Sequence, residues 1–163
     1  MSKQRNASND GIIMTWWQRL SRLPAGAWLF SIALGRLAPY SGTIGARVES
    51  LRPGYARVKL RDRRKLRNHL NSIHAIALVN LGEIATGLAV LSTISGNMRG
   101  IVTNIEADYL KKARGELIAE AEFELPDELN DEIPCEVEAY LRDVSGDTVT
   151  RVRASWLIGY KNT

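Results

Sequence analysis

The sequence predicts a single α+β domain in which an antiparallel sheet curves around one long buried helix. Three observations lead to this prediction. Apolar and polar residues alternate in short segments after residue 42, residues 73–91 are apolar on nearly every side, and the later alternating segments follow too closely for crossover helices. The length of 163 residues suits one domain, and 45% hydrophobic with 25% charged residues is ordinary for a globular protein.

The first 40 residues are expected to form an appendage to this domain. Residues 1–10 are polar and are predicted to be disordered. A helical region follows over residues 14–37 and is broken near Pro24, because proline interrupts a helix. We therefore divide the chain into an N-terminal helical extension, residues 1–40, and a main domain, residues 41–163.

Alternation with a period of two predicts the strands. Residues 56–60 alternate apolar and basic side chains, which indicates a strand with one buried and one solvated face. The Pro53-Gly54 pair supplies the turn before it, and so implies an earlier strand. A Ser145-Gly146-Asp147 turn indicates that the last two strands form a hairpin. The four strands after residue 100 are predicted at residues 101–109, 117–125, 135–141 and 150–160.

One long helix is predicted between the second and third strands. Residues 73–91 contain a single charged residue, Glu83, which indicates a buried helix. At about 1.5 Å per residue it is close to 30 Å long, enough to cross a six-stranded sheet. Gly82 and Gly87 lower its helix propensity but let a neighbouring backbone approach closely. Two strands, a central helix and four strands, in this order, form the hot-dog fold.

Glu83 is the first candidate for chemistry. A carboxylate in an apolar helix costs several kcal/mol of desolvation unless it is paired, hydrogen-bonded or facing a wet cleft. We expect its pKa to be raised, which suits a general base or a nucleophile that works near neutral pH. The alternative is a structural carboxylate bonded to a base or a backbone amide.

The second candidate is the polar stretch just before this helix, residues 68–74. Asn71 or Ser72 can serve as the N-cap, and the free amides of a helix N-terminus suit a carbonyl oxygen that becomes an oxyanion. The alternative is capping alone, with His74 bonded to a nearby carbonyl. A zinc site on His69 and His74 lacks a third ligand, so no metal is predicted.

His74 and Glu83 are nine residues apart, which separates them by about 13 Å along the helix and about 180° around it. One chain therefore cannot easily bring both to the same reacting carbon. If both act together, the site is shared between two subunits related by a twofold axis.

At these residues the sequence resembles the PaaI-like branch of the hot-dog acyl-CoA thioesterases. The family pattern is Asn-x-x-Gly-x-x-His-Gly-Gly, with Asp or Glu nine residues after the His. Here it reads Asn68-x-x-Asn71-x-x-His74-Ala75-Ile76, with Glu83 in the ninth place. Residues 108–115 are similar to the family's Tyr-x-x-Pro-Ala segment. The resemblance covers about residues 42–160 and implies a dimer, or a dimer of dimers, with composite sites.

The resemblance also implies roles for individual residues. Glu83 would activate water or attack the thioester carbon, and Asn68 would orient the water or the substrate. The amides near Ala75 and Ile76, with His74 beside them, would hold the thioester oxygen as it gains charge. Thr86 and Gly87 would shape the acyl pocket or steady the carboxylate. The candidates for the phosphates of coenzyme A are Arg63, Arg64, Lys112 and Arg114, within the basic segments 61–67 and 111–114. No cofactor is expected apart from coenzyme A as part of the substrate.

The sequence departs from the family pattern at several of these positions. Ala75-Ile76 replaces Gly-Gly, Asn71 replaces Gly and Lys112 replaces Pro. The Ile76 side chain restricts how closely a thioester approaches the helix terminus. The alternative to an enzyme is therefore a non-catalytic acyl-CoA or acyl-carrier binding protein. A hydratase on the same fold would need a paired Asp and His that are not apparent.

The distribution of charge and apolar residues bears on partners. Residues 52–67 carry eight bases and one acid, whereas residues 115–141 carry ten acids and no base, so one local cationic patch is expected. It fits a small phosphorylated ligand, and it lacks the aromatic platform of a nucleic-acid site.

The single cysteine, Cys135, favours a reducing compartment, the cytoplasm. The apolar run 23–35 is too short to span a membrane. A packed helix is expected, and the alternative is a membrane-surface helix anchored by Trp16, Trp17, Trp28 and Phe30.

Overall fold

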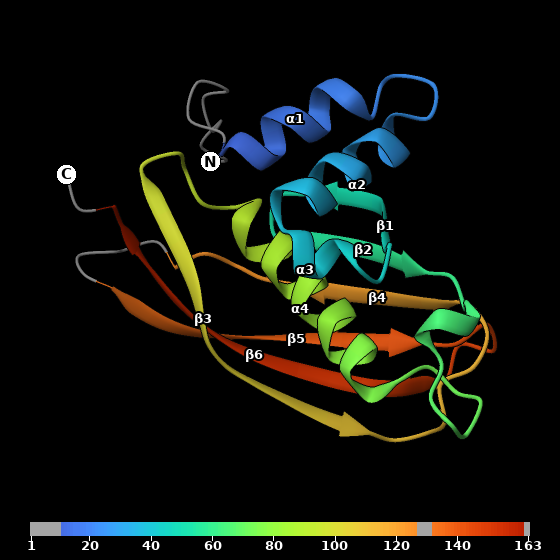
Figure 1. The fold of residues 1–163 in the computed structure, drawn as a ribbon. Helices are drawn as coiled ribbons and strands as arrows, with labels where there is room; N and C mark the ends of the chain where they lie inside the picture. The colour runs from blue at the N-terminus through green and yellow to red at the C-terminus, as the bar shows by residue number, and fades with distance from the viewer. Residues whose placement is uncertain (1–10, 127–131, 162–163) are drawn as a thin grey trace.

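The computed structural model describes residues 11–126 and 132–161 (Figure 1). Within this range six strands form one antiparallel sheet in the order β1-β2-β4-β5-β6-β3. Hydrogen-bonded neighbours are therefore not always consecutive in sequence, and β3 lies at one edge while β1 lies at the other. The strand bounds are β1 Arg47–Arg52, β2 Tyr55–Leu60, β3 Met98–Tyr109, β4 Leu117–Glu122, β5 Ile133–Arg142 and β6 Thr148–Tyr160.

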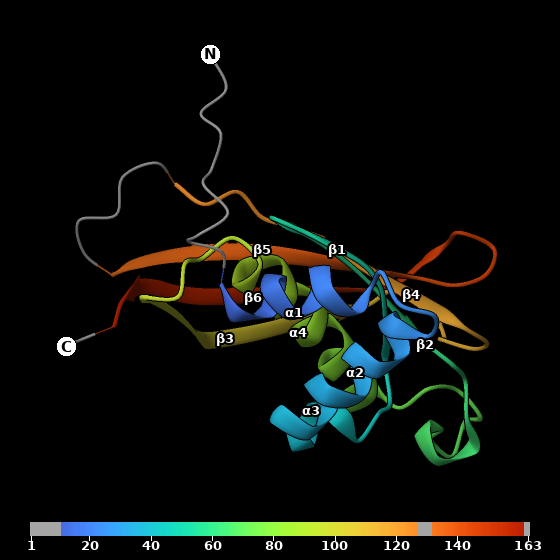
Figure 2. The same ribbon diagram turned by 90° about the horizontal axis from the view of Figure 1, so that it is seen from above.

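The long helix α4, Ala75–Leu91, lies in the hollow of the sheet, which curves around it (Figures 1 and 2). The inward-facing side chains of the sheet, such as Val58 and Val152, are fully buried against it. Gly82 is required at the closest approach, because a β-carbon there would overlap the Val152 side chain. This arrangement is the hot-dog fold, so the predicted fold class is confirmed.

The element bounds differ from prediction where tertiary contacts override local pattern. The helix begins at Ala75, because Ile73 is still extended and donates its N–H to the Ala113 carbonyl at 2.8 Å. His74 is therefore the N-cap, and the prediction of Asn71 or Ser72 as cap is wrong. The strand predicted over residues 117–125 ends at Glu122.

The predicted helical region is two helices, α1 Ile12–Leu20 and α2 Gly26–Leu37, followed by the short α3, Pro39–Gly42. They lie on the same side of the sheet as α4 (Figure 2). Phe30 is 1% exposed in the main core, and the Trp17 ring meets it edge-on at 5.1 Å. Phe30 and Trp17 therefore pack inside, contrary to the membrane-anchor alternative, whereas Trp16 and Trp28 are exposed.

Two further sequence predictions concern these N-terminal residues. The predicted disorder of residues 1–10 falls outside the residues that the structure describes. The proposed boundary near residue 40 stays a prediction, although α1 and α2 share the core of the main domain through Ile13, Met14 and Phe30. Among the helices that the structure describes, none is long and apolar enough to cross a membrane.

Ser31 ties α2 to the edge of the sheet. Its Oγ accepts a hydrogen bond from the Val48 N–H of β1 at 2.9 Å. We expect Ser31→Ala to lower the free energy of unfolding by about 1–2 kcal/mol, because it leaves a part-buried backbone donor unsatisfied. Urea unfolding measures this. Thr15→Ala is the matched control, since among the described residues the Thr15 hydroxyl bonds only the carbonyl of Gly11, the N-cap of α1. A loss as large as that of Ser31→Ala would contradict the prediction.

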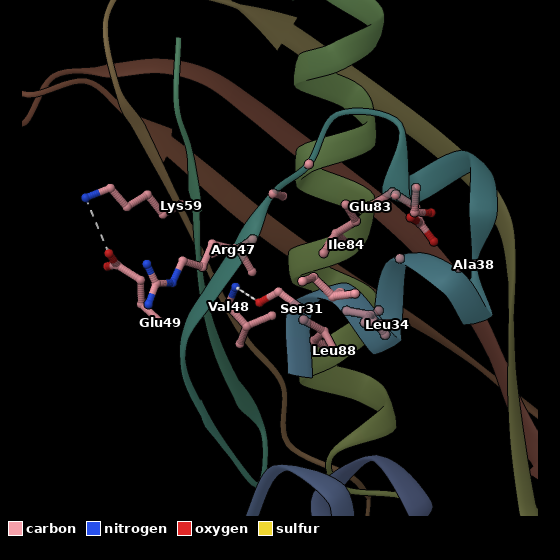
Figure 3. A pocket seen from close by; sticks show the side chains of 18 of the residues that line it. Ser31, Leu34, Ala38, Arg47, Val48, Glu49, Lys59, Glu83, Ile84 and Leu88 are labelled. Atoms are coloured by element: carbon pink, nitrogen blue, oxygen red, sulfur yellow. Dashed lines mark hydrogen bonds and ion pairs between the residues drawn. The ribbon is translucent and has the colours of Figure 1, made fainter. Parts of the chain in front are cut away.

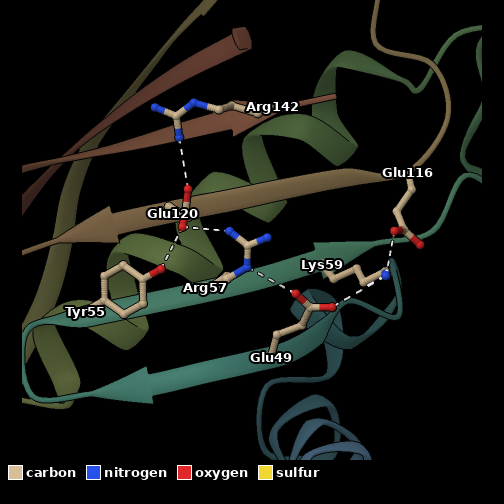
Figure 4. A network of polar contacts seen from close by, with 7 residues as sticks. All are labelled: Glu49, Tyr55, Arg57, Lys59, Glu116, Glu120 and Arg142. Carbon is tan, nitrogen blue, oxygen red and sulfur yellow. Dashed lines mark hydrogen bonds and ion pairs between the residues drawn. The ribbon is translucent and has the colours of Figure 1, made fainter. Parts of the chain in front are cut away.

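Ion pairs cover the outer face of the sheet (Figure 4). Glu120 of β4 accepts hydrogen bonds from Tyr55 at 2.7 Å and from Arg57 at 2.8 Å, and these bonds lower the pKa of its carboxyl. We expected the bases of residues 52–67 to form one free cationic patch. The pairing of β2 with β1 and β4 neutralises Arg57 and Lys59 instead. The network consists of Glu49, Tyr55, Arg57, Lys59, Glu116, Glu120 and Arg142.

Candidate active site

A cavity of about 760 Å³ lies between the N-terminal helices and the main domain (Figure 3). Its walls come from α2, α3, β1, the end of β2 and the second half of α4, together with Trp156 of β6. The volume is within the range of small-molecule sites, about 300–1,000 Å³. The α2 wall was not expected from the sequence, because contact between residues some 50 positions apart leaves no local pattern.

The Glu83 carboxylate lies in the wall of this cavity (Figure 3). Burial raises the pKa of the Glu83 carboxyl above its ordinary value of 4.5, and a hydrogen bond from the Ser41 hydroxyl lowers it in part. Glu83 forms no ion pair with any residue that the structure describes. The alternative prediction, a structural carboxylate bonded to a base or a backbone amide, therefore finds no such partner among the described residues. The predicted rise in the pKa of Glu83 is present.

Gly87 keeps space open beside the carboxylate. It lines the cavity one turn beyond Glu83, and a β-carbon there would lie 3.2 Å from Cη2 of Trp156 and 3.8 Å from Oε1 of Glu83. Thr86, the other residue predicted for the acyl pocket, is fully buried and does not line the cavity. Its hydroxyl donates to the Glu83 carbonyl at 3.1 Å, which is a bond within the helix.

The start of α4 carries one engaged amide and one free amide. The Ile76 N–H donates to Nδ1 of His74 at 3.1 Å, so the ring of His74 caps the helix as an acceptor. The Ala75 N–H has no acceptor among the described residues. The Ile76 side chain is 54% exposed beside these amides. Of the two amides predicted to hold an oxyanion, Ala75 offers the one that is unoccupied.

The loop before α4 is held by its own polar side chains. Oδ1 of Asn68 accepts from the Leu70 N–H at 2.9 Å and from the Ser72 N–H and hydroxyl at 3.2 Å each. Asn71 has a φ of 55°, a left-handed conformation that asparagine tolerates better than most residues. The replacement of the family's glycine by Asn71 is therefore accommodated, and the Asn68 oxygen is committed to the loop.

The two predicted clusters remain apart within one chain. Asn68, His74, Ala75 and Ile76 do not line the Glu83 cavity. Glu83 is eight residues into α4, about 12 Å from its first residue along the axis. The predicted sharing of the site between two subunits is thus compatible with this geometry and stays a prediction.

The predicted phosphate-binding bases differ in what they contact. Arg63 lines the cavity and donates to the Ile44 carbonyl, whereas Arg114 donates to the Asn71 and Leu70 carbonyls at 3.3 and 3.5 Å. Arg64 and Lys112 are exposed and lie away from the cavity. Lys111 is paired with Asp143 and Asp147. The cavity instead brings Arg36 and Arg47, which no motif indicated, next to Arg61 of the predicted segment.

Within residues 11–126 and 132–161, no group of three His, Cys, Asp or Glu side chains is placed to hold a metal ion. The site that the fold builds is therefore a partly buried carboxylate in an amphipathic cavity on a hot-dog scaffold, with a separate helix terminus.

The chain belongs to the family described as a domain of unknown function (DUF4442), which matches residues 26–158. The match begins at the first residue of α2 and so includes the helix that lines the cavity. No curated protein matches the chain in sequence.

Solved structures share the fold. The genomics protein APC5556 is 29% identical with a TM-score of 0.77, over 91% of this chain and 99% of that one. PA5026 from Pseudomonas aeruginosa, named a probable thioesterase, is 22% identical with a TM-score of 0.69, over 85% and 97%. A thioesterase family protein from Silicibacter pomeroyi is 18% identical with a TM-score of 0.69, over 80% and 96%. The resemblance to hot-dog thioesterases is thereby confirmed in fold.

Proposed function

We propose that this protein hydrolyses acyl-CoA thioesters to a free acid and coenzyme A. The observation that carries the proposal is the Glu83 carboxylate, partly buried and without an ion pair among the described residues, in the wall of a ligand-sized cavity. The names of the structural neighbours support the same class of reaction for those proteins. Because these neighbours are only 22% and 18% identical to this chain, the substrate and the residue roles are proposals that the experiments below test.

In the proposed reaction the Glu83 carboxylate removes a proton from water as the water attacks the thioester carbon, or attacks that carbon itself. The carbonyl oxygen gains negative charge and is held by the free Ala75 N–H at the N-terminus of a partner subunit's α4, where the helix dipole also favours an anion. His74 caps that terminus, and with Nδ1 accepting from Ile76 a neutral ring carries its proton on Nε2. In the water route the C–S bond then breaks, the acid forms, and the thiolate of coenzyme A takes the proton that Glu83 holds. In the direct route the thiolate leaves as a mixed anhydride forms on Glu83, and water then hydrolyses this anhydride, which releases the acid, restores the carboxylate and supplies the proton to the thiolate.

A homodimer is part of this proposal, and the edge strand β3 supports it. β3 is twelve residues long and, among the described strands, pairs with β6 alone, so its outer edge presents backbone groups that a second copy can bind. Ile101 and Tyr109 on β3 are about half exposed, as is Ile76 at the start of α4. Tyr109 donates to the Ala75 carbonyl at 3.3 Å, which places this edge next to the helix terminus that the site needs.

The second candidate function is binding of acyl-CoA or an acyl carrier without turnover. It is favoured by the engaged Ile76 amide and by the exposed Ile76 side chain at the helix terminus. Incubation with acyl-CoAs of increasing chain length, with free thiol measured, separates the two candidates. Thiol release supports the hydrolase, whereas calorimetric binding without thiol release supports the binding protein.

We propose the cytoplasm as the compartment, because Cys135 is the single cysteine of the sequence.

The pH dependence of hydrolysis follows from the environment of Glu83. Because the active form is the carboxylate and its pKa is raised, kcat/KM should fall on acidification at a pH above the ordinary 4.5. Ser41→Ala removes the hydrogen bond that lowers this pKa, so we expect the acid limb of the profile to move to higher pH. Thr43→Ala is the control, since its hydroxyl bonds only the Tyr40 carbonyl. An unmoved limb in Ser41→Ala would argue against Glu83 as the titrating group.

A further inference from the structure

The walls of the Glu83 cavity carry an excess of positive charge. Two acids line the cavity, Glu49 and Glu83. Five bases line it, which are Arg36, Arg47, Lys59, Arg61 and Arg63. Lys59 is paired with Glu116 at 2.6 Å and with Glu49 at 3.6 Å, and Arg63 is bonded to the Ile44 carbonyl. Three arginines remain for a ligand.

These three arginines have no partner among the residues that the structure describes. Several other arginines of the fold are paired with carboxylates, as Arg57 is with Glu120 and Arg151 with Asp108. Arg36, Arg47 and Arg61 come from α2, the start of β1 and the residue after β2, and all three are exposed at the cavity. Three guanidinium groups that line one cavity without a partner among the described residues attract an anion, and their planar donor sets match phosphate oxygens.

Apart from the hydroxyls of Ser31 and Ser41, the rest of the cavity is lined by apolar residues. Leu34 of α2 and Ile84, Leu88 and Leu91 of α4 line it, with Val48 beside Arg47 on β1 (Figure 3). Leu88 and Leu91 lie about 7 and 12 Å beyond Glu83 along the helix. The cavity therefore suits an amphiphile with an apolar chain and an anionic group, and its volume of about 760 Å³ is large enough for a ligand with both.

We propose that Arg36, Arg47 and Arg61 bind the phosphate groups of coenzyme A at the opening of the cavity in which Glu83 lies. This inference rests on the proposed function for the identity of the ligand. It moves the phosphate contacts from Arg64, Lys112 and Arg114 to a surface that the N-terminal helix α2 helps to build. The N-terminal helices thus become part of the substrate site.

A pair of substrates tests the proposal. The same acyl group is presented on coenzyme A and on pantetheine, which carries the thioester but no phosphate. We expect Arg47→Gln and Arg61→Gln each to raise KM for acyl-CoA about tenfold, the loss of one charge-assisted hydrogen bond, and to change KM for acyl-pantetheine less than about twofold. Arg19→Gln and Arg22→Gln remove the same charge from exposed positions outside the cavity, and should leave both KM values unchanged.

Each other outcome has a definite meaning. An equal rise in KM for both substrates would overturn the proposal. It would also be overturned if the Arg64→Gln, Lys112→Gln double variant lost the preference for coenzyme A while the cavity variants kept it. If the protein hydrolyses neither substrate, the proposed hydrolase activity is wrong, but calorimetry with free coenzyme A still tests the phosphate site. Binding that is lost in the Arg36, Arg47, Arg61 triple glutamine variant supports the phosphate site, and no binding by the native protein rejects it.

Discussion

Glu83→Gln should lower kcat/KM for acyl-CoA by at least about 100-fold, the usual contribution of a general base. Glutamine has the size of glutamate and can still accept the hydrogen bond from Ser41, but it cannot take a proton from water or attack a carbon. The affinity for acyl-CoA should change little, because the cavity keeps its shape. Thiol release measures the rate, and calorimetry measures binding.

Glu49→Gln is the matched control for this substitution. Glu49 is the other carboxylate at the cavity, but it is held in the ion-pair network, at 3.2 Å from Arg57 and 3.6 Å from Lys59 (Figure 4). We expect its removal to change kcat/KM less than about threefold, as for a surface ion pair. Native turnover in Glu83→Gln, or an equal loss in Glu49→Gln, would remove Glu83 from the mechanism.

The same Glu83→Gln variant should be more stable than the native protein at pH 8. The folded-state pKa of Glu83 is above its unfolded value, so over the interval between them the folded protein holds a proton that the unfolded chain has released. The free energy of unfolding therefore falls as pH rises through this interval, by about 1.4 kcal/mol for each pH unit between the two pKa values. Glutamine avoids this loss, and its advantage should vanish below pH 4. Urea unfolding at both pH values checks the sign.

A mixed dimer of two inactive variants should recover about half of the native activity per dimer. One parent is Glu83→Gln and the other is Ala75→Pro. Proline is favoured at the first position of a helix and removes only the free Ala75 N–H, and His74, with φ −64° and ψ 139°, already has the extended backbone that a following proline requires. In the mixed dimer one of the two composite sites keeps both the carboxylate and the amide.

Co-expression with two affinity tags isolates this mixed dimer. Ala75→Ser is the control, because it keeps the amide and should retain turnover in the pure form. A mixed dimer as inactive as its parents would place the whole site within one subunit. A chain that elutes as a monomer at assay concentration would exclude the shared site altogether.

The fold could be predicted because its signals are local and repeated. Alternation over residues 56–60 and 150–160 identifies half-buried strands, and the single charge in residues 73–91 identifies a buried helix. The misplaced helix cap has a tertiary cause. Ile73 is held extended by the distant Ala113 carbonyl, a contact that no pattern near residue 73 encodes.

The site was predictable in part, for a related reason. Glu83 stands out in sequence because a charge in an apolar helix is rare, and its burial bears this out. The rest of the wall was not predictable, since Ser41, Arg36 and Arg47 line one cavity with Glu83 only after α2 folds back over β1. Asn68 and Arg114 illustrate the converse, because polar side chains near a motif turned out to hold the loop.

The paired charges on the convex side of the sheet also restrict how two dimers could associate into a tetramer. Back-to-back stacking would strip water from Glu120, Arg57, Lys59 and their partners, and the cost of drying so many ions generally exceeds the attraction between them. The helical side, where Trp16, Trp28 and Leu37 are exposed to solvent, would cost less to cover if a tetramer formed. Quaternary assembly and access to the cavity beneath α2 would then be coupled.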